Sequence, residues 1–206
     1  MGQTDLSPPI GRDGGWADAE PPCGNAAHAE LPVRPYDLLT LAVGRAIAAT
    51  WSLLGLRNAA GMLRHYLAGT GAPRRVDAEA LLALPVVREA VDAQLARWRA
   101  EALERGSGRA PAAYPADSGW RDVFIGRRAS RDWWLALRCV EFRLTGTVRV
   151  DGSGGLAVDY RFAVHKAYNF DRGGSELGVP FTPFARLHET GLARQFTVTG
   201  EAFGHA

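Results

Sequence analysis

Two runs of alternating apolar residues, on either side of the pentapeptide 151–155 (DGSGG), constrain this 206-residue chain more than any other feature. Alternation with a period of two around a cluster of glycine, aspartate and serine predicts a β-hairpin, and glycines allow the positive φ angles that such a connection uses. The apolar sets are Val140, Phe142, Leu144, Gly146, Val148 and Val150, then Leu156, Val158, Tyr160, Phe162 and Val164. We therefore predict a hairpin over residues 138–166 with one apolar face.

The apolar faces also fix the register of this hairpin. Pairing Val150 with Leu156 aligns the two apolar sets, whereas a slip of one residue would turn one set outward. The same register places Glu141 opposite His165 on the second face, which is polar. Asp159 lies further along that face, because it is an even number of residues from His165.

The polar face and the strand end that follows it supply the candidate catalytic residues. These candidates are Glu141, Asp159, His165, Tyr168 and Asp171. A histidine beside a carboxylate can act as a general acid or base, and loops at strand ends often carry functional groups. The other interpretation is a solvated face with ordinary cross-strand pairs, followed by a turn.

No catalytic or ligand-binding motif decides between these interpretations. The sequence contains no phosphate loop and no GxSxG, HExxH or GxGxxG pattern. The five histidines and the two cysteines, Cys23 and Cys139, do not have metal-ligand spacings. We therefore predict no cofactor, no metal site and no disulfide. The net charge of +2 gives no signal for nucleic acid.

The N-terminal part of the chain divides into a leader and a helical region. Residues 1–35 contain six prolines and five glycines, which predicts a disordered leader. No secretory signal peptide is visible, so we expect a protein that is cytoplasmic as made, with export by another route left open. Residues 36–68 read as helix, and the window Leu38–Leu56 carries one charge, Arg45. That helix is buried in the protein, inserts conditionally into a membrane, or spans one; we favour the buried helix, because Arg45 opposes insertion.

The remaining segments complete an α+β prediction. Residues 76–104 form a second helical region with Asp77 as N-cap, and 105–119 are rich in Gly, Pro and Ser, which predicts a loop. Ser130 or Asp132 starts a short helix, and Thr182 caps another. The last run predicts a third strand. The expected architecture is one domain, 36–206, in which a helical part (36–104) precedes a sheet part (120–203). That sheet part is a small antiparallel sheet with a helix packed on it.

Four stretches, in their order and spacing, resemble a bacterial domain family. They are 58–67 followed by Gly69-Thr70-Gly71, then 130–137, then 168–171 (YNFD), and last 187–196 ending at Gly200. Together they resemble a largely uncharacterised domain that often closes proteins similar to polymorphic toxins or type VII secretion substrates, especially in actinobacteria. The resemblance covers about residues 58–203. It departs at 165–167 (HKA), where the family commonly has an acidic-basic pair.

The resemblance implies a toxin-like effector domain in bacterial competition, for which an immunity protein would be the natural partner. It supplies no catalytic residues. The mechanism stays open between membrane perturbation through 36–68 and a hydrolytic site on the hairpin face. The alternative is a non-catalytic binding or structural module.

Overall fold

The computed structural model describes residues 25–105, 112–151, 155–176 and 178–206, and it confirms the α+β class. The central residues of the hairpin connection (152–154) and Cys23 lie outside these ranges. The helices are α1 (Pro35–Leu53), α2 (Arg57–Leu67), α3 (Ala78–Leu82), α4 (Pro85–Arg105), α5 (Arg131–Ala136) and α6 (Thr182–Glu189). The strands are β1 (Arg74–Arg75), β2 (Ala112–Asp117), β3 (Arg121–Phe124), β4 (Cys139–Val150), β5 (Leu156–Tyr168), β6 (Ser175–Glu176), β7 (Val179–Pro180) and β8 (Phe196–His205).

The predicted hairpin is the centre of the sheet, and its register is as expected. β4 and β5 pair antiparallel with Val150 opposite Leu156 and Glu141 opposite His165. The larger sheet has the order β1-β8-β5-β4-β2, and β3 also pairs with β4. At Gly146 the two hairpin strands approach so closely that a Cβ atom would stand 2.1 Å from the carbonyl oxygen of Asp159. Only glycine fits there without moving the backbone.

The sheet has three strands that the sequence pattern did not reveal, and one of them, β1, pairs parallel with β8, so the sheet is mixed rather than purely antiparallel. β2 falls inside the predicted loop 105–119, and β3 follows it where no strand was predicted. β2 is an edge strand in which half-buried residues alternate with exposed ones. Its Pro115 has no N–H to donate, which an edge strand tolerates. The loop prediction for 105–119 is therefore wrong at 112–117, because the pairing surface comes from β4.

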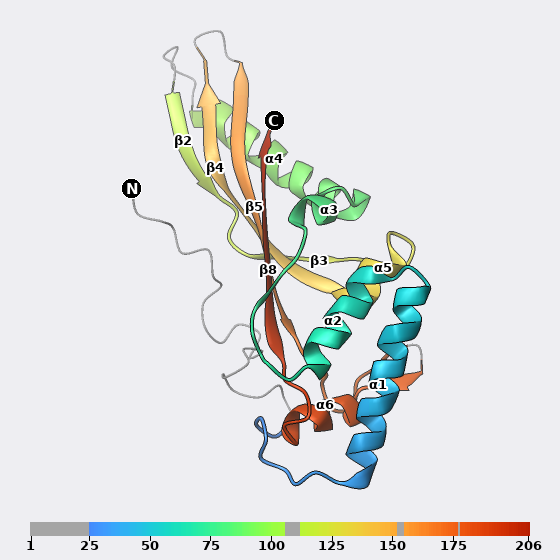
Figure 1. The fold of residues 1–206 in the computed structure, drawn as a ribbon. Helices are drawn as coiled ribbons and strands as arrows, with labels where there is room; N and C mark the ends of the chain where they lie inside the picture. The colour runs from blue at the N-terminus through green and yellow to red at the C-terminus, as the bar shows by residue number, and fades with distance from the viewer. Residues whose placement is uncertain (1–24, 106–111, 152–154, 177) are drawn as a thin grey trace.

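One face of the sheet is covered by helices, and the core lies between the two layers. Figure 1 shows α3 and α4 beside the upper half of the sheet, and α1, α2, α5 and α6 gathered around its lower end. The buried side chains of α4 and of the apolar hairpin face belong to one cluster. That cluster includes Val87, Val91, Leu95, Trp98, Phe142, Leu144 and Phe162. The apolar face predicted from the sequence is thus the face that the helices bury.

The predicted helix 36–68 is two helices with a sharp turn between them. Gly55 adopts a φ of 76°, a conformation that glycine takes without steric cost. α2 then begins at Arg57, and the carboxylate of Asp132 accepts hydrogen bonds from the backbone N–H groups of Asn58 and Ala59 at 3.1 and 2.8 Å. A carboxylate in this position satisfies the unpaired donors of a helix start. Across the described residues, we find no helix with the length and apolar content to span a membrane.

The other predicted caps have mixed outcomes. Asp77 and Ser130 accept hydrogen bonds from Ala80 and Trp133, as N-caps do. Thr182, in contrast, is the first residue of α6 and does not cap it. Its hydroxyl accepts a hydrogen bond from the N–H of Gly173 instead, so Thr182 ties the preceding turn to the helix.

Residues 25–34, which fall in the predicted leader, make defined contacts with the domain. Asn25 donates its amide to the carbonyl oxygen of Phe170 at 2.8 Å and accepts a hydrogen bond from the N–H of Arg172. The N–H groups of Ala29 and Leu31 donate to the carbonyl oxygens of the last two residues of α6. This segment therefore lies against the turn after β5 and the end of α6.

Candidate functional site

The five candidate catalytic residues do not form one site. Glu141 and His165 do meet as predicted, with His165 Nδ1 3.3 Å from Glu141 Oε2. Both are buried, at 8% and 3% exposure, and the ring of Trp120 lies edge-on to His165 with centroids 5.9 Å apart. The face that the sequence predicts to be polar is therefore closed at this end of the sheet, where the pair is part of the interior.

Asp159 lies far from this pair, in a different set of interactions. It is six residues from His165 along β5, which is about 20 Å in an extended strand. Its carboxylate forms an ion pair with Arg149 and lies 2.7 Å from Nδ1 of His205. The hydrogen bond from His205 and the charge of Arg149 hold the pKa of Asp159 below its usual value. The structure thus separates Asp159 from Glu141 and His165.

Tyr168 faces the opposite side of the sheet, because it is an odd number of residues from His165. Its ring stacks on Phe196 with centroids 4.9 Å apart and also meets Phe170 at 5.7 Å. Burial raises the pKa of the Tyr168 phenol. The phenol therefore stays protonated at neutral pH, and the side chain packs in an aromatic core.

Asp171 is the exposed member of the set, and it belongs to a polar cluster that the sequence did not reveal. Asn169 donates its amide to the Asp171 carboxylate at 2.8 Å. The next residue, Arg172, forms a two-pronged ion pair with Glu189 at the end of α6, with Nε 2.7 Å from Oε1. We call Asn169, Asp171, Arg172, His188 and Glu189 the turn cluster.

Glu189 is the anchor of the turn cluster. Its side chain is fully buried, and it lies at a helix C-terminus, where a negative charge is unfavourable. The guanidinium of Arg172 compensates this charge, and the N–H of Ala26 donates to Oε1 at 3.0 Å. A buried carboxylate with these partners is stable only while they stay in place, so Glu189 fixes both the turn and residues 25–31.

His188 is a neutral imidazole inside the same cluster. It is 3% exposed, its Nδ1 accepts from the N–H of Gln195 at 3.4 Å, and the ring of His28 lies 5.0 Å away. Burial, with the nearby His28 and Arg194, lowers the pKa of His188 from 6.5 to about 4. His188 is therefore a packed, hydrogen-bonded histidine.

The turn cluster offers hydrogen-bonding and acid-base groups rather than metal ligands. The exposed Asp171 carboxylate can accept a proton, and the partly exposed Arg172 guanidinium can donate hydrogen bonds to a polar ligand, whereas the His188 imidazole is buried. Within the described ranges, no group of histidine, cysteine or acidic side chains is arranged to hold a metal ion. Sequence reasoning missed Arg172 and Glu189 because their pairing spans 17 residues and leaves no local pattern.

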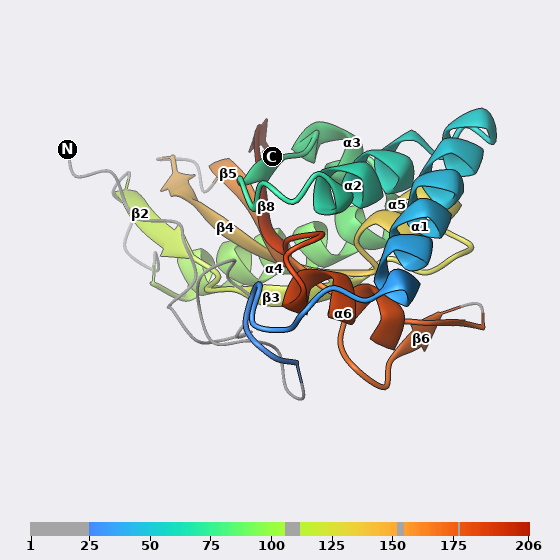
Figure 2. The ribbon, with the colours of Figure 1, turned by 60° about the horizontal axis from the view of Figure 1, so that its bottom comes forward.

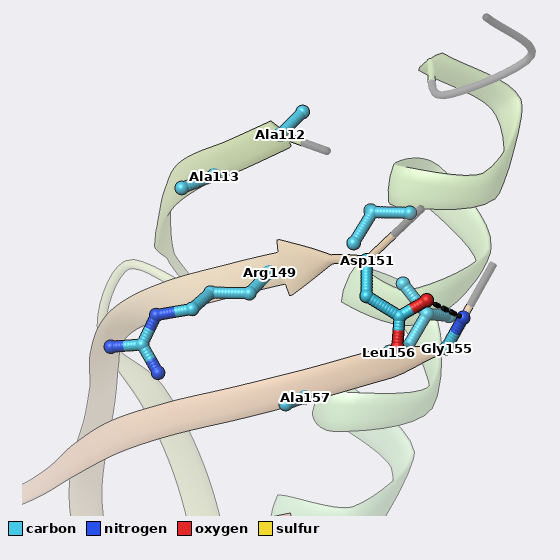
Figure 3. Close-up of a pocket in the computed structure, with 8 residues that line it drawn as sticks. Ala112, Ala113, Arg149, Asp151, Gly155, Leu156 and Ala157 are labelled. Atoms are coloured by element: carbon cyan, nitrogen blue, oxygen red, sulfur yellow. Dashed lines mark hydrogen bonds between the residues drawn. The ribbon is translucent and has the colours of Figure 1, made fainter. Parts of the chain in front are cut away.

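A hollow at the tip of the hairpin is a weaker candidate. It has a volume of about 630 Å³, and residues of β2, β4 and β5 make up most of its lining. Figure 3 shows its two charged side chains turned away from each other. Asp151 accepts from the N–H of Gly155 at 2.8 Å, and Arg149 pairs with Asp159. Both are engaged with the protein itself, so we do not assign a site there.

The four stretches of the family resemblance meet in space. Asp132, from the second stretch, binds Asn58 in the first. Tyr66 accepts a backbone hydrogen bond from Arg194 at 3.0 Å and packs near Tyr168, with centroids 6.1 Å apart. Tyr168 in turn stacks on Phe196. Residues from all four stretches therefore belong to one packed unit at the lower end of the sheet.

Comparisons with known proteins give only distant structural likeness. No protein-family model matches the chain, and no curated protein matches it in sequence. PaeM, a colicin M-like bacteriocin from Pseudomonas aeruginosa, is 13% identical with a TM-score of 0.42, over 72% of this chain and 50% of that one. Truncated syringacin M, a bacteriocin from Pseudomonas syringae pv. tomato DC3000, is 16% identical with a TM-score of 0.38, over 72% and 59%. The chain thus matches only half to three fifths of these structures, and TM-scores this low establish neither a shared fold nor a shared activity.

Proposed function

We propose that this chain is a toxin-like effector domain of bacterial competition. The observation that supports the proposal is the meeting of the four stretches that resemble polymorphic-toxin-like domains. Each stretch is loose by itself, and they are spread over residues 58–200. Direct contacts nonetheless join the first to the second, third and fourth, and the third to the fourth. If the resemblance extends over a whole domain, the four stretches should pack together, and they do.

The hydrolytic chemistry of this proposal belongs at the turn cluster rather than on the hairpin face. Glu141 and His165 are buried, and Asp159 is paired with Arg149 and His205. Asp171 differs from them because it is exposed and has an amide donor beside it. In this role the Asp171 carboxylate accepts a proton from water or from a substrate hydroxyl, and Asn169 fixes its orientation.

The second candidate function is a non-catalytic binding module, with an immunity protein as one possible partner class. It is favoured by a specific observation, namely that Glu141, Asp159, His165 and Tyr168 are all engaged in packing or ion pairs. A domain of this kind would recognise its partner through its surface and would have no need of reactive groups.

Expression in bacteria separates the two candidates. The chain is produced in the cytoplasm and, with an export signal, in the periplasm, and growth is followed after induction. We expect growth arrest in at least one compartment. Asp171→Asn should relieve it, while Asp92→Asn, the same change at an exposed position of α4, should not. Both variants should keep the wild-type melting temperature, because both positions are exposed.

The outcomes assign the mechanism. Toxicity that survives Asp171→Asn but is lost with Leu53→Glu would favour membrane perturbation through 36–68 over hydrolysis. A wild-type chain that is harmless in both compartments would overturn the toxin proposal and leave the binding module. His165→Ala is unsuitable here, because it leaves the Glu141 carboxylate buried without its histidine, and a loss of toxicity could then reflect a loss of fold.

A further inference from the structure

Most of the exposed large apolar side chains within the described ranges lie on α1 or directly beside its ends. Of the eleven large apolar residues that are exposed within the described ranges, seven fall between positions 33 and 54. They are Val33, Tyr36, Leu38, Leu39, Val43, Leu53 and Leu54. Leu53 is 89% exposed and Leu39 is 61% exposed. Exposed apolar residues scattered singly are ordinary, but a contiguous group on one element indicates an interaction surface.

The α1 helix buries small or polar residues on its inner side and exposes an apolar outer side. Its inner side packs through small residues: Ala48 is fully buried, and a Cβ atom at Gly44 would lie 3.1 Å from Leu67 in α2. Its outer side consists of Leu39, Ala42, Val43, Ala46, Ala49, Thr50 and Leu53, in which Thr50 is the one polar residue. The apolar side of an amphipathic helix normally faces the core of its own protein, whereas this one faces outward. We call the exposed outer side the α1 ridge.

Figures 1 and 2 place α1 at the outside of the molecule in both views, with α2 and α6 on its inner side. The ridge is convex, because it is the outer surface of one rod-like helix. A convex apolar rod does not hold a small ligand, which requires a concave pocket. A convex apolar surface is instead suited to a deformable apolar environment such as the acyl region of a lipid bilayer.

The exposed charges of the segment that contains the ridge, residues 35–72, are basic. Between residues 35 and 72 the sequence has one carboxylate, Asp37, and three arginines. Asp37 is 1% exposed and forms an ion pair with Arg186, whose Nε lies 2.7 Å from Oδ1. Arg45, at the border of the ridge, and Arg57, just beyond its Leu53 end, are both exposed. Within residues 35–72 the exposed charges are therefore all positive, because the one acid of this segment is buried and paired.

We propose that the α1 ridge docks flat on an anionic lipid bilayer. Only the outer side of α1 is available, so the helix would lie along the membrane plane over about 28 Å, at 1.5 Å per residue. Leu39, Val43 and Leu53 would enter the boundary between headgroups and acyl chains. Arg45 and Arg57 would stay at the level of the lipid phosphates and pair with them. A second protein, or a second copy of this chain, is the competing occupant and is an outcome of the test.

The test is cosedimentation of the purified full chain with lipid vesicles. The vesicles are phosphatidylcholine alone, or phosphatidylcholine mixed with phosphatidylglycerol, at low and at physiological salt. We expect binding to the anionic vesicles that weakens as salt screens the charges. Leu53→Glu should reduce partitioning at least about tenfold, because an apolar group is lost from the boundary. Arg45→Gln should reduce it about fivefold.

Phe203→Glu is the matched control, since it places the same charge at a 74% exposed apolar residue of β8, away from the ridge. It should bind as the wild type does. The proposal is overturned if the wild type does not bind anionic vesicles, or if Phe203→Glu weakens binding as much as Leu53→Glu. It is also overturned if the wild type is a dimer that Leu53→Glu dissociates, as measured by sedimentation velocity, since the ridge would then be a self-interface.

Vesicle binding and toxicity can fail independently. A chain that binds vesicles but does not arrest growth would support membrane docking by the ridge and contradict the toxin proposal. A chain that arrests growth but does not bind vesicles would contradict membrane docking alone. Melting temperatures of the three variants should match the wild type, because each substituted side chain is exposed.

Discussion

At the scale of single residues, burial decides what a polar side chain can do. Glu141 and His165 have the residue types and the pairing of a catalytic dyad, yet both are inside the protein. A group that contacts neither solvent nor substrate cannot exchange a proton with them. Asp171 is exposed and lies in a turn, so its carboxylate can exchange protons with solvent or with a bound substrate.

His188 makes the first prediction, which concerns stability as a function of pH. Its pKa is lowered from 6.5 to about 4 in the folded protein, so the unfolded chain takes up its proton first as the pH falls. Stability is therefore highest above about pH 6.5 and declines as the pH falls towards 4, by up to about 3 kcal/mol. Urea unfolding at a series of pH values measures this decline.

A His188→Gln variant isolates the contribution of this imidazole. Its free energy of unfolding should be nearly flat between pH 6.5 and 5, where the wild type already loses stability. Asp117 and Asp159 do not contribute to this difference in slope, because their pKa values are lowered from 3.8 and they take up protons only at more acidic pH. Identical slopes for the variant and the wild type would show that His188 is not the titrating group.

At the scale of elements, the hairpin has one face for the core and one for ion pairs. Phe142 is 2% exposed, and its ring packs against Phe162. Arg143, on the other face, forms a two-pronged pair with Asp117 of β2, with Nε 2.9 Å from Oδ1, and its side chain is only 18% exposed. That face is thus partly covered and not merely solvated.

The second prediction compares these two neighbours. Phe142→Ala should lower the free energy of unfolding by about 3–5 kcal/mol, as for other buried aromatic residues. Arg143→Ala should cost about 1 kcal/mol, because it removes a partly exposed pair that links β2 to β4. Chemical denaturation of both variants measures the two values. Equal losses would contradict the assignment of one hairpin face to the core and the other to partly exposed ion pairs.

At the scale of the whole molecule, residues 25–31 tie the N-terminal side of the chain to the turn cluster. They contribute the Asn25 and Ala26 hydrogen bonds and two backbone hydrogen bonds to the end of α6. Without them the Glu189 carboxylate would lose a donor and part of its cover. The stability of the turn cluster is therefore coupled to a segment far away in sequence.

The third prediction tests this coupling with two truncations. A chain that begins at Asn25 is compared with one that begins at Pro32, so that the two differ only by residues 25–31. The shorter chain should melt several degrees lower, in line with a loss of about 1–3 kcal/mol for a buried group deprived of a partner. Thermal unfolding followed by circular dichroism measures the difference. Equal melting temperatures would show that these residues are dispensable for folding, as a leader would be.

The sequence by itself determined the hairpin, its register and its buried face, because strand periodicity is local and a slip of one residue would expose an apolar set. It also predicted the cap at Asp77, which depends on residues three positions apart, and narrowed the start of α5 to Ser130 or Asp132, of which the structure has Ser130 as the cap. Only the tertiary structure decided that β2 pairs with β4, that Glu141 and His165 are closed off, and that Arg172 finds Glu189. These features depend on which distant segments meet, and burial and ion pairing between distant segments leave no pattern along the chain.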